Sequence, residues 1–243
     1  MTELTELTEA QRALLTQRLR RRKSATTIPA LPEEQPPPLS YAQERLWFME
    51  QYAPGNPAHT IPFVRRLRGP LSANLLGEAL NRVAARHQPL RTHFPVGDDG
   101  QPAVTVSAAV TVPLTVADLT SSPAEDSTDE ARALADRFLA EPFDLAAGPV
   151  IKALLVRLAA DDHVLAIAVH HIAADGWSAN ILLREILTCY DGGPLPELPV
   201  TYGDFAAWQR ERPGGADDVA YWRERLAGLP PLELPTDFPG RPS

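Results

Sequence analysis

The stretch Val-His-His-Ile-Ala-Ala-Asp-Gly-Trp-Ser, residues 169–178, closes an apolar run that starts at residue 163, and it precedes a helical pattern. Because this run is apolar at nearly every position, we predict a strand in a sheet that is covered on both faces. Neighbouring residues of a strand point to opposite faces, so His170 and His171 cannot both address one cavity. The strand end therefore predicts one histidine at a functional site and one histidine packed into the structure.

A second apolar run lies upstream, at residues 150–158, and Asp161-Asp162 between the two runs indicates the turn of a β-hairpin. Outside this hairpin the pattern alternates between helix and strand periods. We expect strands at 90–96, 103–106 and 114–118, an apolar stretch at 59–67, and helices at 41–51, 72–87, 128–139 with a cap near Ser127, 177–190, 202–212 and 219–227. The alternation predicts a mixed α/β fold in which helices flank a sheet.

The two ends of the chain differ in composition from the part between them. Residues 8–23 carry leucines and end on a basic run, which suits a helix, whereas the prolines within 24–38 favour an extended linker. We expect the folded unit to span residues 39–228 and a proline-rich tail to follow at 229–243. Two interpretations of residues 8–23 stay open, an exposed leader and a docking helix.

Composition narrows the classes of function. The formal net charge of −8 opposes binding to nucleic acid, because phosphate-binding proteins concentrate Lys and Arg. The single cysteine, Cys189, cannot form an internal disulfide, and we recognise no signal peptide or long apolar run. We therefore expect a cytoplasmic protein with neither nucleic acid nor a membrane as its partner. No metal site is expected, because the histidines outside the motif, His59, His87, His93 and His163, lack metal-ligand spacing.

Four motifs occur along the chain: LSYAQERLWF at 39–48, RHQPLRTHF at 86–94, HHIAADG at 170–176 and YGDFAAWQ at 202–209. With them the chain resembles the condensation domain of nonribosomal peptide synthetases, whose signatures are SxAQxRLW, RHxxLRTxF, HHxxxDG and YxDFAxW in this order. The resemblance implies a chloramphenicol-acetyltransferase-like lobe, with a mixed, largely antiparallel sheet flanked by helices. A complete condensation domain holds two such lobes around a tunnel. We therefore expect this chain to be the N-terminal lobe, with its tail leading towards an absent C-terminal lobe, and to be a poor catalyst alone.

The resemblance gives His171 the central role in the reaction. Amide-bond formation joins the amine of an acceptor aminoacyl thioester to the carbonyl of a donor acyl or peptidyl thioester. Each substrate is carried on the phosphopantetheine of a carrier protein, and no cofactor is expected to bind the chain itself. His171 would accept the proton of the amine or orient it, and both roles stay open. Gly176 permits close approach of the backbone, and its N–H would donate to the developing oxyanion.

Other residues of the site are expected to support His171. The family pattern implies a salt bridge between Asp175 and Arg91, with His170 packed or hydrogen-bonded behind the catalytic ring. Candidate tunnel-lining residues are Trp177, Ser178, Tyr41 and Arg45. For these four, packing within the core of the lobe is the competing interpretation.

The expected partners are donor and acceptor carrier proteins, the C-terminal lobe, and an upstream synthetase subunit bound through residues 8–23. Three other functions share parts of the pattern: a related HxxxD acyltransferase, an epimerisation domain, and a non-catalytic module that docks a carrier protein. The flanking motifs oppose an acyltransferase that uses a coenzyme A donor. The continuation Asp175-Gly176-Trp177-Ser178 favours condensation over epimerisation, and a cyclising relative would carry aspartates in place of the histidines.

Overall fold

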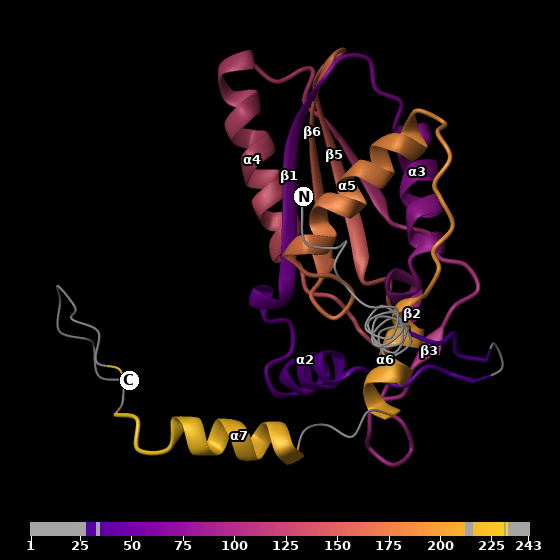
Figure 1. The fold of residues 1–243 in the computed structure, drawn as a ribbon. Coiled ribbons are helices and arrows are strands. Elements are labelled where there is room, and N and C mark those ends of the chain that lie inside the picture. The colour runs from indigo at the N-terminus through magenta and orange to yellow at the C-terminus, as the bar shows by residue number, and fades with distance from the viewer. Residues whose placement is uncertain (1–27, 33–34, 212–215, 231, 233–243) are drawn as a thin grey trace, which may run out of the picture. The chain divides into compact units, whose positions relative to one another are not determined.

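The structure is a computed structural model, and it describes residues 28–32, 35–211, 216–230 and 232 (Figure 1). The chain divides into two compact units, Met1–Gln209 and Arg210–Ser243, and each is described by itself. The helix expected at 8–23 lies outside the described residues, as do most residues of the tail expected at 229–243.

A four-stranded sheet forms the centre of the first unit (Figure 1). Its strands lie in the order β1 (Thr60–Arg68), β6 (Asp162–His170), β5 (Ile151–Ala159) and β4 (Leu114–Asp118). β6 pairs antiparallel with β1 and with β5, whereas β4 pairs parallel with β5. This sheet confirms the expected mixed, largely antiparallel topology, and the two apolar runs of the sequence form its central strands.

The helices of the first unit are α2 (Tyr41–Tyr52), α3 (Ala73–Arg86), α4 (Ala124–Ala140), α5 (Gly176–Tyr190) and, except for its last two residues, α6 (Tyr202–Glu211). The short 3₁₀ helices η1 (Pro57–His59) and η2 (Gln88–Arg91) belong to the same unit. In the second unit, α7 spans Ala216–Leu226. The cap expected near Ser127 is wrong, because α4 already begins at Ala124 and buries Ser127 within the helix. Pro123 precedes α4, and its fixed φ suits a helix start.

Helices cover the two faces of the sheet (Figure 1). Successive side chains of β5 alternate between these faces, so Ile151 and Leu155 pack with α3 and α5, whereas Leu154 and Val156 pack with α4. The buried side chains of β6 alternate between the two faces of the sheet in the same way. The prediction of a sheet covered on both faces is therefore confirmed, and the end of β6 is held within a rigid core.

Two strands and one turn differ from the expected boundaries. The strand expected at 90–96 shrinks to β2 (Thr92–His93), which pairs with β3 (Thr105–Val106). Pro89 explains the difference, because it lacks a ladder N–H and favours the first turn of η2. The hairpin turn is one residue earlier than expected, since β5 ends at Ala159 and β6 already begins at Asp162.

β1 forms one edge of the four-stranded sheet and carries charged side chains. Three arginines, Arg65, Arg66 and Arg68, lie within its nine residues. Arg66 makes a bidentate ion pair with Asp162 at the start of β6, with 2.8 Å between Nε and Oδ1. This pair is well exposed, so we expect it to contribute little to stability.

Candidate active site

The loop between β6 and α5 is fixed by a capping box at its far end. The Asp175 carboxylate accepts hydrogen bonds from the backbone N–H of Ser178 at 2.8 Å and from its hydroxyl at 2.7 Å. In return, Ser178 Oγ accepts from the Asp175 N–H at 3.3 Å. The hydrogen bonds from Ser178 hold the pKa of Asp175 below its ordinary value. The loop therefore enters α5 in one defined direction.

The two motif histidines lie in different environments, as the strand alternation predicts. His170 is 2% exposed, whereas His171 is exposed to solvent. The backbone N–H of His170 donates to the carbonyl of Val150, and that of His171 donates to the carbonyl of His59 over 2.8 Å. Both backbones are thus held by neighbouring segments, with one ring inside the protein and the other outside.

The ring of His170 is neutral and has a fixed tautomer. Its Nδ1 accepts the backbone N–H of Ile172 at 3.0 Å, so the proton of the neutral ring lies on Nε2. Burial lowers the pKa of His170 to about 4, although the nearby Glu50 carboxylate acts in the opposite direction. His59 and Phe143 pack against the ring edge-on.

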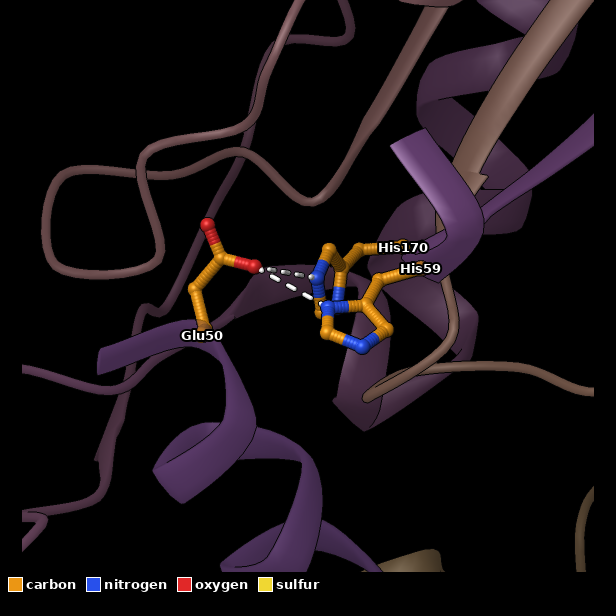
Figure 2. A group of neighbouring side chains, drawn as sticks. All are labelled: Glu50, His59 and His170. Carbon is orange, nitrogen blue, oxygen red and sulfur yellow. Dashed lines mark hydrogen bonds and ion pairs between the residues drawn. The ribbon is translucent and has the colours of Figure 1, made fainter. Parts of the chain in front are cut away.

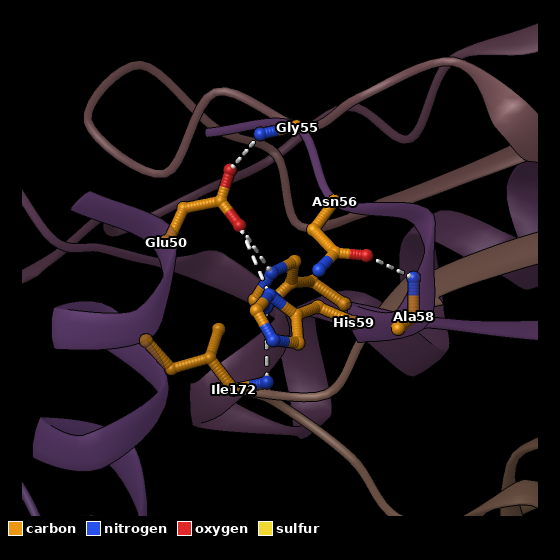
Figure 3. A network of polar contacts seen from close by, with 7 residues as sticks. Glu50, Gly55, Asn56, Ala58, His59 and Ile172 are labelled. Atoms are coloured by element: carbon orange, nitrogen blue, oxygen red, sulfur yellow. Dashed lines mark hydrogen bonds and ion pairs between the residues drawn. The ribbon is translucent and has the colours of Figure 1, made fainter. Parts of the chain in front are cut away.

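Glu50 brings three parts of the chain together behind the motif (Figure 2). One carboxylate oxygen accepts the backbone N–H of Gly55 at 2.6 Å. The other accepts a hydrogen bond from Nδ1 of His59 at 3.2 Å and lies 3.6 Å from Nε2 of His170. Figure 3 shows this network with Glu50, Gly55, His59 and Ile172 labelled, and the Ile172 N–H donates to Nδ1 of His170. Glu50 is not among the residues expected at the site, because its partner in the motif, His170, is distant in the sequence.

The same three side chains raise the question of a metal site, since their donor atoms lie within 4.8 Å of one another. A metal on Nε2 of His170 would require that nitrogen to lose its proton. The proton of the neutral ring would then lie on Nδ1, facing the N–H of Ile172. The donor chemistry therefore favours a hydrogen-bonded cluster over a metal centre.

The inward face of α2 is polar where it meets the motif. Gln43, Trp47 and Glu50 are its buried residues, at a spacing that places them on one side of the helix. Gln43 donates from Nε2 to the carbonyl of Ile172 at 3.4 Å, and Trp47 donates from Nε1 to the carbonyl of Phe94 at 3.0 Å. This spacing is the sequence signal that could have identified Glu50 as a residue facing the site.

The expected salt bridge between Asp175 and Arg91 is wrong. Arg91 instead donates from its guanidinium to the carbonyls of Ala85 and Ser107. The Asp175 carboxylate is occupied by the cap of α5 and lies at the surface. Asp175 thus caps α5, whereas Arg91 links η2 to α3 and to the residue that follows β3.

The remaining expected site residues are largely exposed. Trp177 is 82% exposed and Tyr41 is 49% exposed, and Arg45 is exposed as well, so none of the three packs in the core of this chain. Ser178 is partly buried and engaged in the cap. Apart from its two neighbours and the backbone of α5, no described atom lies within 4 Å of a methyl group added at Gly176, so packing among the described residues does not require a glycine there.

A pocket of about 210 Å³ lies beside the motif, between the end of α3, the first turns of α5 and residues 198–202. Ala173, Ala174 and Ser178 contribute to its wall, but His171 does not. The first and last motifs also meet nearby, where Ser40 Oγ and the hydroxyl of Tyr202 are 2.9 Å apart. The structure therefore gathers all four motifs around one end of the sheet.

Among the described residues, no helix combines the length and the apolar character that crossing a membrane requires.

Comparison with known proteins agrees with this arrangement. Residues 33–243 match the family model of the condensation domain. One of the linear gramicidin synthase proteins of Brevibacillus parabrevis is 41% identical over 226 residues, which cover 89% of this chain and 3% of that protein. Phosphinothricin tripeptide synthetase PhsC of Streptomyces viridochromogenes is 40% identical over 257 aligned residues, covering 98% of this chain and 23% of the relative.

A solved structure, the complex of the X-domain and OxyB from teicoplanin biosynthesis, matches with a TM-score of 0.73 and 30% identity. The match covers 89% of this chain and 49% of that chain. The chain therefore spans a small part of the two synthetases and about half of the solved chain. Its sheet with helices on both faces is a chloramphenicol-acetyltransferase-like fold, and the match over residues 33–243 shows that the chain belongs to the condensation domain family.

Proposed function

We propose that this chain is the N-terminal lobe of a nonribosomal peptide synthetase condensation domain, in which His171 serves amide-bond formation. One observation carries the proposal: the ring of His171 is exposed at the end of a buried central strand, in a chain of the condensation domain family. On this proposal residues 1–38 are an N-terminal helix and linker, 39–228 form the lobe, and 229–243 lead towards the C-terminal lobe.

The reaction would take place between two thioesters, each on the phosphopantetheine of a carrier protein. The amine nitrogen of the acceptor attacks the carbonyl carbon of the donor, a C–N bond forms and the C–S bond breaks. The nitrogen loses one proton, and the leaving thiolate gains one. A free α-amine has a pKa of about 8, so part of it is already neutral near pH 7. His171 would hold this amine or accept its proton as the amide forms.

Gly176 would support the tetrahedral intermediate. Its N–H is one of the first amides of α5, which have no partner within the helix. A backbone donor at this place suits a developing oxyanion. The open space beside Gly176 supports this role, because among the described residues no packed side chain requires a glycine there.

A second lobe would complete the site. The chain covers about half of the solved relative, which supports the half-domain proposal. Several large side chains near the motif and on α2 are exposed, namely Tyr41 at 49%, Phe48 at 61%, Tyr52 at 80% and Trp177 at 82%. Aromatic side chains that line a tunnel or a lobe interface would be exposed in this way when one lobe is described alone.

The proposal implies further partners. Donor and acceptor carrier proteins would bring the substrates, and an upstream synthetase subunit would bind residues 8–23. The chain would bind no cofactor of its own, and it would act in the cytoplasm without nucleic acid or membrane.

Reconstitution tests the proposal. The chain is mixed with loaded donor and acceptor carriers, with and without a separately expressed C-terminal lobe, and the product is followed by intact mass. We expect condensed product only with the second lobe, and its loss in His171→Ala but not in the exposed control Glu78→Ala. Carrier binding without any product, unaffected by His171→Ala, would instead favour a docking module. Product formed from a coenzyme A donor would favour a related acyltransferase.

A further inference from the structure

We propose that Glu50 is a positioning residue for His171, and that it acts through His59 and His170. The inference rests on the proposed function of His171. Glu50 does not touch the exposed ring, so its effect would pass through the backbone that carries this ring.

His59 is the link between the two residues. Its side chain donates from Nδ1 to Glu50 at 3.2 Å, because a carboxylate can only accept. Its carbonyl accepts the backbone N–H of His171 at 2.8 Å. The side chain of His59 is 12% exposed and that of Glu50 is 10% exposed, so little water competes for the bond between them. Glu50 thus fixes the residue that fixes the backbone of His171.

His170 provides the second connection. Its ring accepts the N–H of Ile172 at Nδ1 and directs Nε2 towards Glu50 at 3.6 Å. His170 and Ile172, the residues on both sides of His171, are therefore tied together through the buried ring of His170. Nε2 of His170 has no hydrogen-bond partner at normal distance, so the negative charge of Glu50 is the group that offsets the burial of this N–H.

Glu50 itself is held in place. The Gly55 N–H at 2.6 Å fixes one oxygen, so the other is directed at the two rings. Gln43, two turns earlier on the inward side of α2, donates to the carbonyl of Ile172 at 3.4 Å. The inward face of α2 therefore contacts the motif at two points, and Glu50 is the charged one.

The test compares Glu50→Gln with the exposed control Glu78→Gln, both in the whole chain. Glutamine keeps the size of the side chain but presents an amide, which cannot accept from Gly55, His59 and His170 together. Glu50→Ala is the harsher variant, so the near-isosteric one carries the test. Hydrogen exchange and nitrogen-detected NMR of the histidine rings need no catalysis, and they stay informative if the proposed function fails.

We expect Glu50→Gln to accelerate exchange of the His171 amide about tenfold and to shift the imidazole resonances of His171, with the amide of Leu165 in the middle of β6 unchanged. Unchanged exchange and resonances at His171 would overturn the proposal. Equal acceleration at Leu165 would also overturn it, because that result marks a general loss of stability.

Activity provides an independent readout in the reconstituted reaction. Glu50→Gln should lower kcat about tenfold, leave the KM for the carriers unchanged, and cause no further loss in a His171→Ala background. A residue that serves only the stability of the lobe would cost the same factor in both backgrounds. Such additivity would refute the positioning role.

Discussion

The carbonyl of His59 accepts the backbone N–H of His171 at 2.8 Å. The segment directly before β1 therefore fixes the backbone that carries the exposed His171 ring. The same His59 donates its ring N–H to Glu50. The position of His171 is thus fixed through its backbone inside the protein, while its imidazole ring remains exposed and open to a substrate.

Replacing His171 by alanine should affect activity and leave stability unchanged. The side chain is exposed and contributes little to the core, so we expect the free energy of unfolding to change by less than about 0.5 kcal/mol. Condensation should fall about 10²- to 10⁴-fold, the usual contribution of a general base. Urea unfolding and the product assay, run on one preparation, check both parts. A variant that loses activity only because it unfolds would contradict this separation.

Stability should decrease in mild acid because of His170. Its pKa is about 4 in the folded protein against about 6.5 unfolded, so the unfolded chain takes up the proton first. The contribution is complete above pH 6.5, decreases as the pH falls, and is fully lost near pH 4, with a total of about 3 kcal/mol. Burial lowers the pKa of His163 in the same direction.

Urea unfolding of the native chain and of His170→Phe at pH 7 and pH 5 isolates this term. The native chain should lose about 2 kcal/mol more than the variant between these two pH values. Phenylalanine cannot accept the Ile172 N–H, so the variant should be less stable at pH 7. Identical losses in both proteins would exclude His170 as the group responsible.

Asp175→Ala should destabilise the chain as the loss of a helix cap. We expect about 1 kcal/mol, because the Ser178 N–H loses its acceptor at the start of α5. A double-mutant cycle with Arg91→Ala should give a coupling energy near zero, since the two residues have different partners. Coupling above about 1 kcal/mol would restore the salt bridge that the family pattern implies.

Tyr52→Ser should weaken the association of two lobes without weakening this one. Tyr52 is 80% exposed, so its loss removes little packing from the described chain. If the C-terminal lobe covers this part of α2, its affinity should drop at least about tenfold, measured by calorimetry. The exposed leucine Leu75 on α3 offers a matched control in Leu75→Ser. Equal affinities for Tyr52→Ser and the native chain would place the lobe interface elsewhere.

Sequence periodicity predicts much of this fold because the central strands carry an unusual signal. β5 and β6 are apolar at almost every position, and the amphipathic helices beside them have regular spacing. The boundaries fail where local chemistry competes with the pattern. Pro89 favours η2 at the start of the segment expected to be a strand, and α4 begins before Ser127, the residue expected near its cap.

Only those features of the site that depend on neighbouring residues could be predicted from the sequence. The alternation of side chains along β6 predicts one buried and one exposed histidine, and this prediction requires no knowledge of distant contacts. Glu50 and His59 contact His170 across more than a hundred residues of sequence. The helical spacing of Gln43, Trp47 and Glu50 can place Glu50 on the inward face of α2, but it does not identify His170 as the partner. The Asp175–Arg91 pair failed for the opposite reason, since Ser178 supplies a nearer partner.

The arginines of β1 have a consequence for the exposed edge of the sheet. An edge strand has backbone N–H and C=O groups that can pair with a strand of another chain, and such pairing leads to aggregation. Arg65, Arg66 and Arg68 place positive charge along this edge strand. A strand of another chain that paired with β1 would have to bury this charge. The charge of these arginines thereby opposes the pairing of another chain with this edge of the sheet.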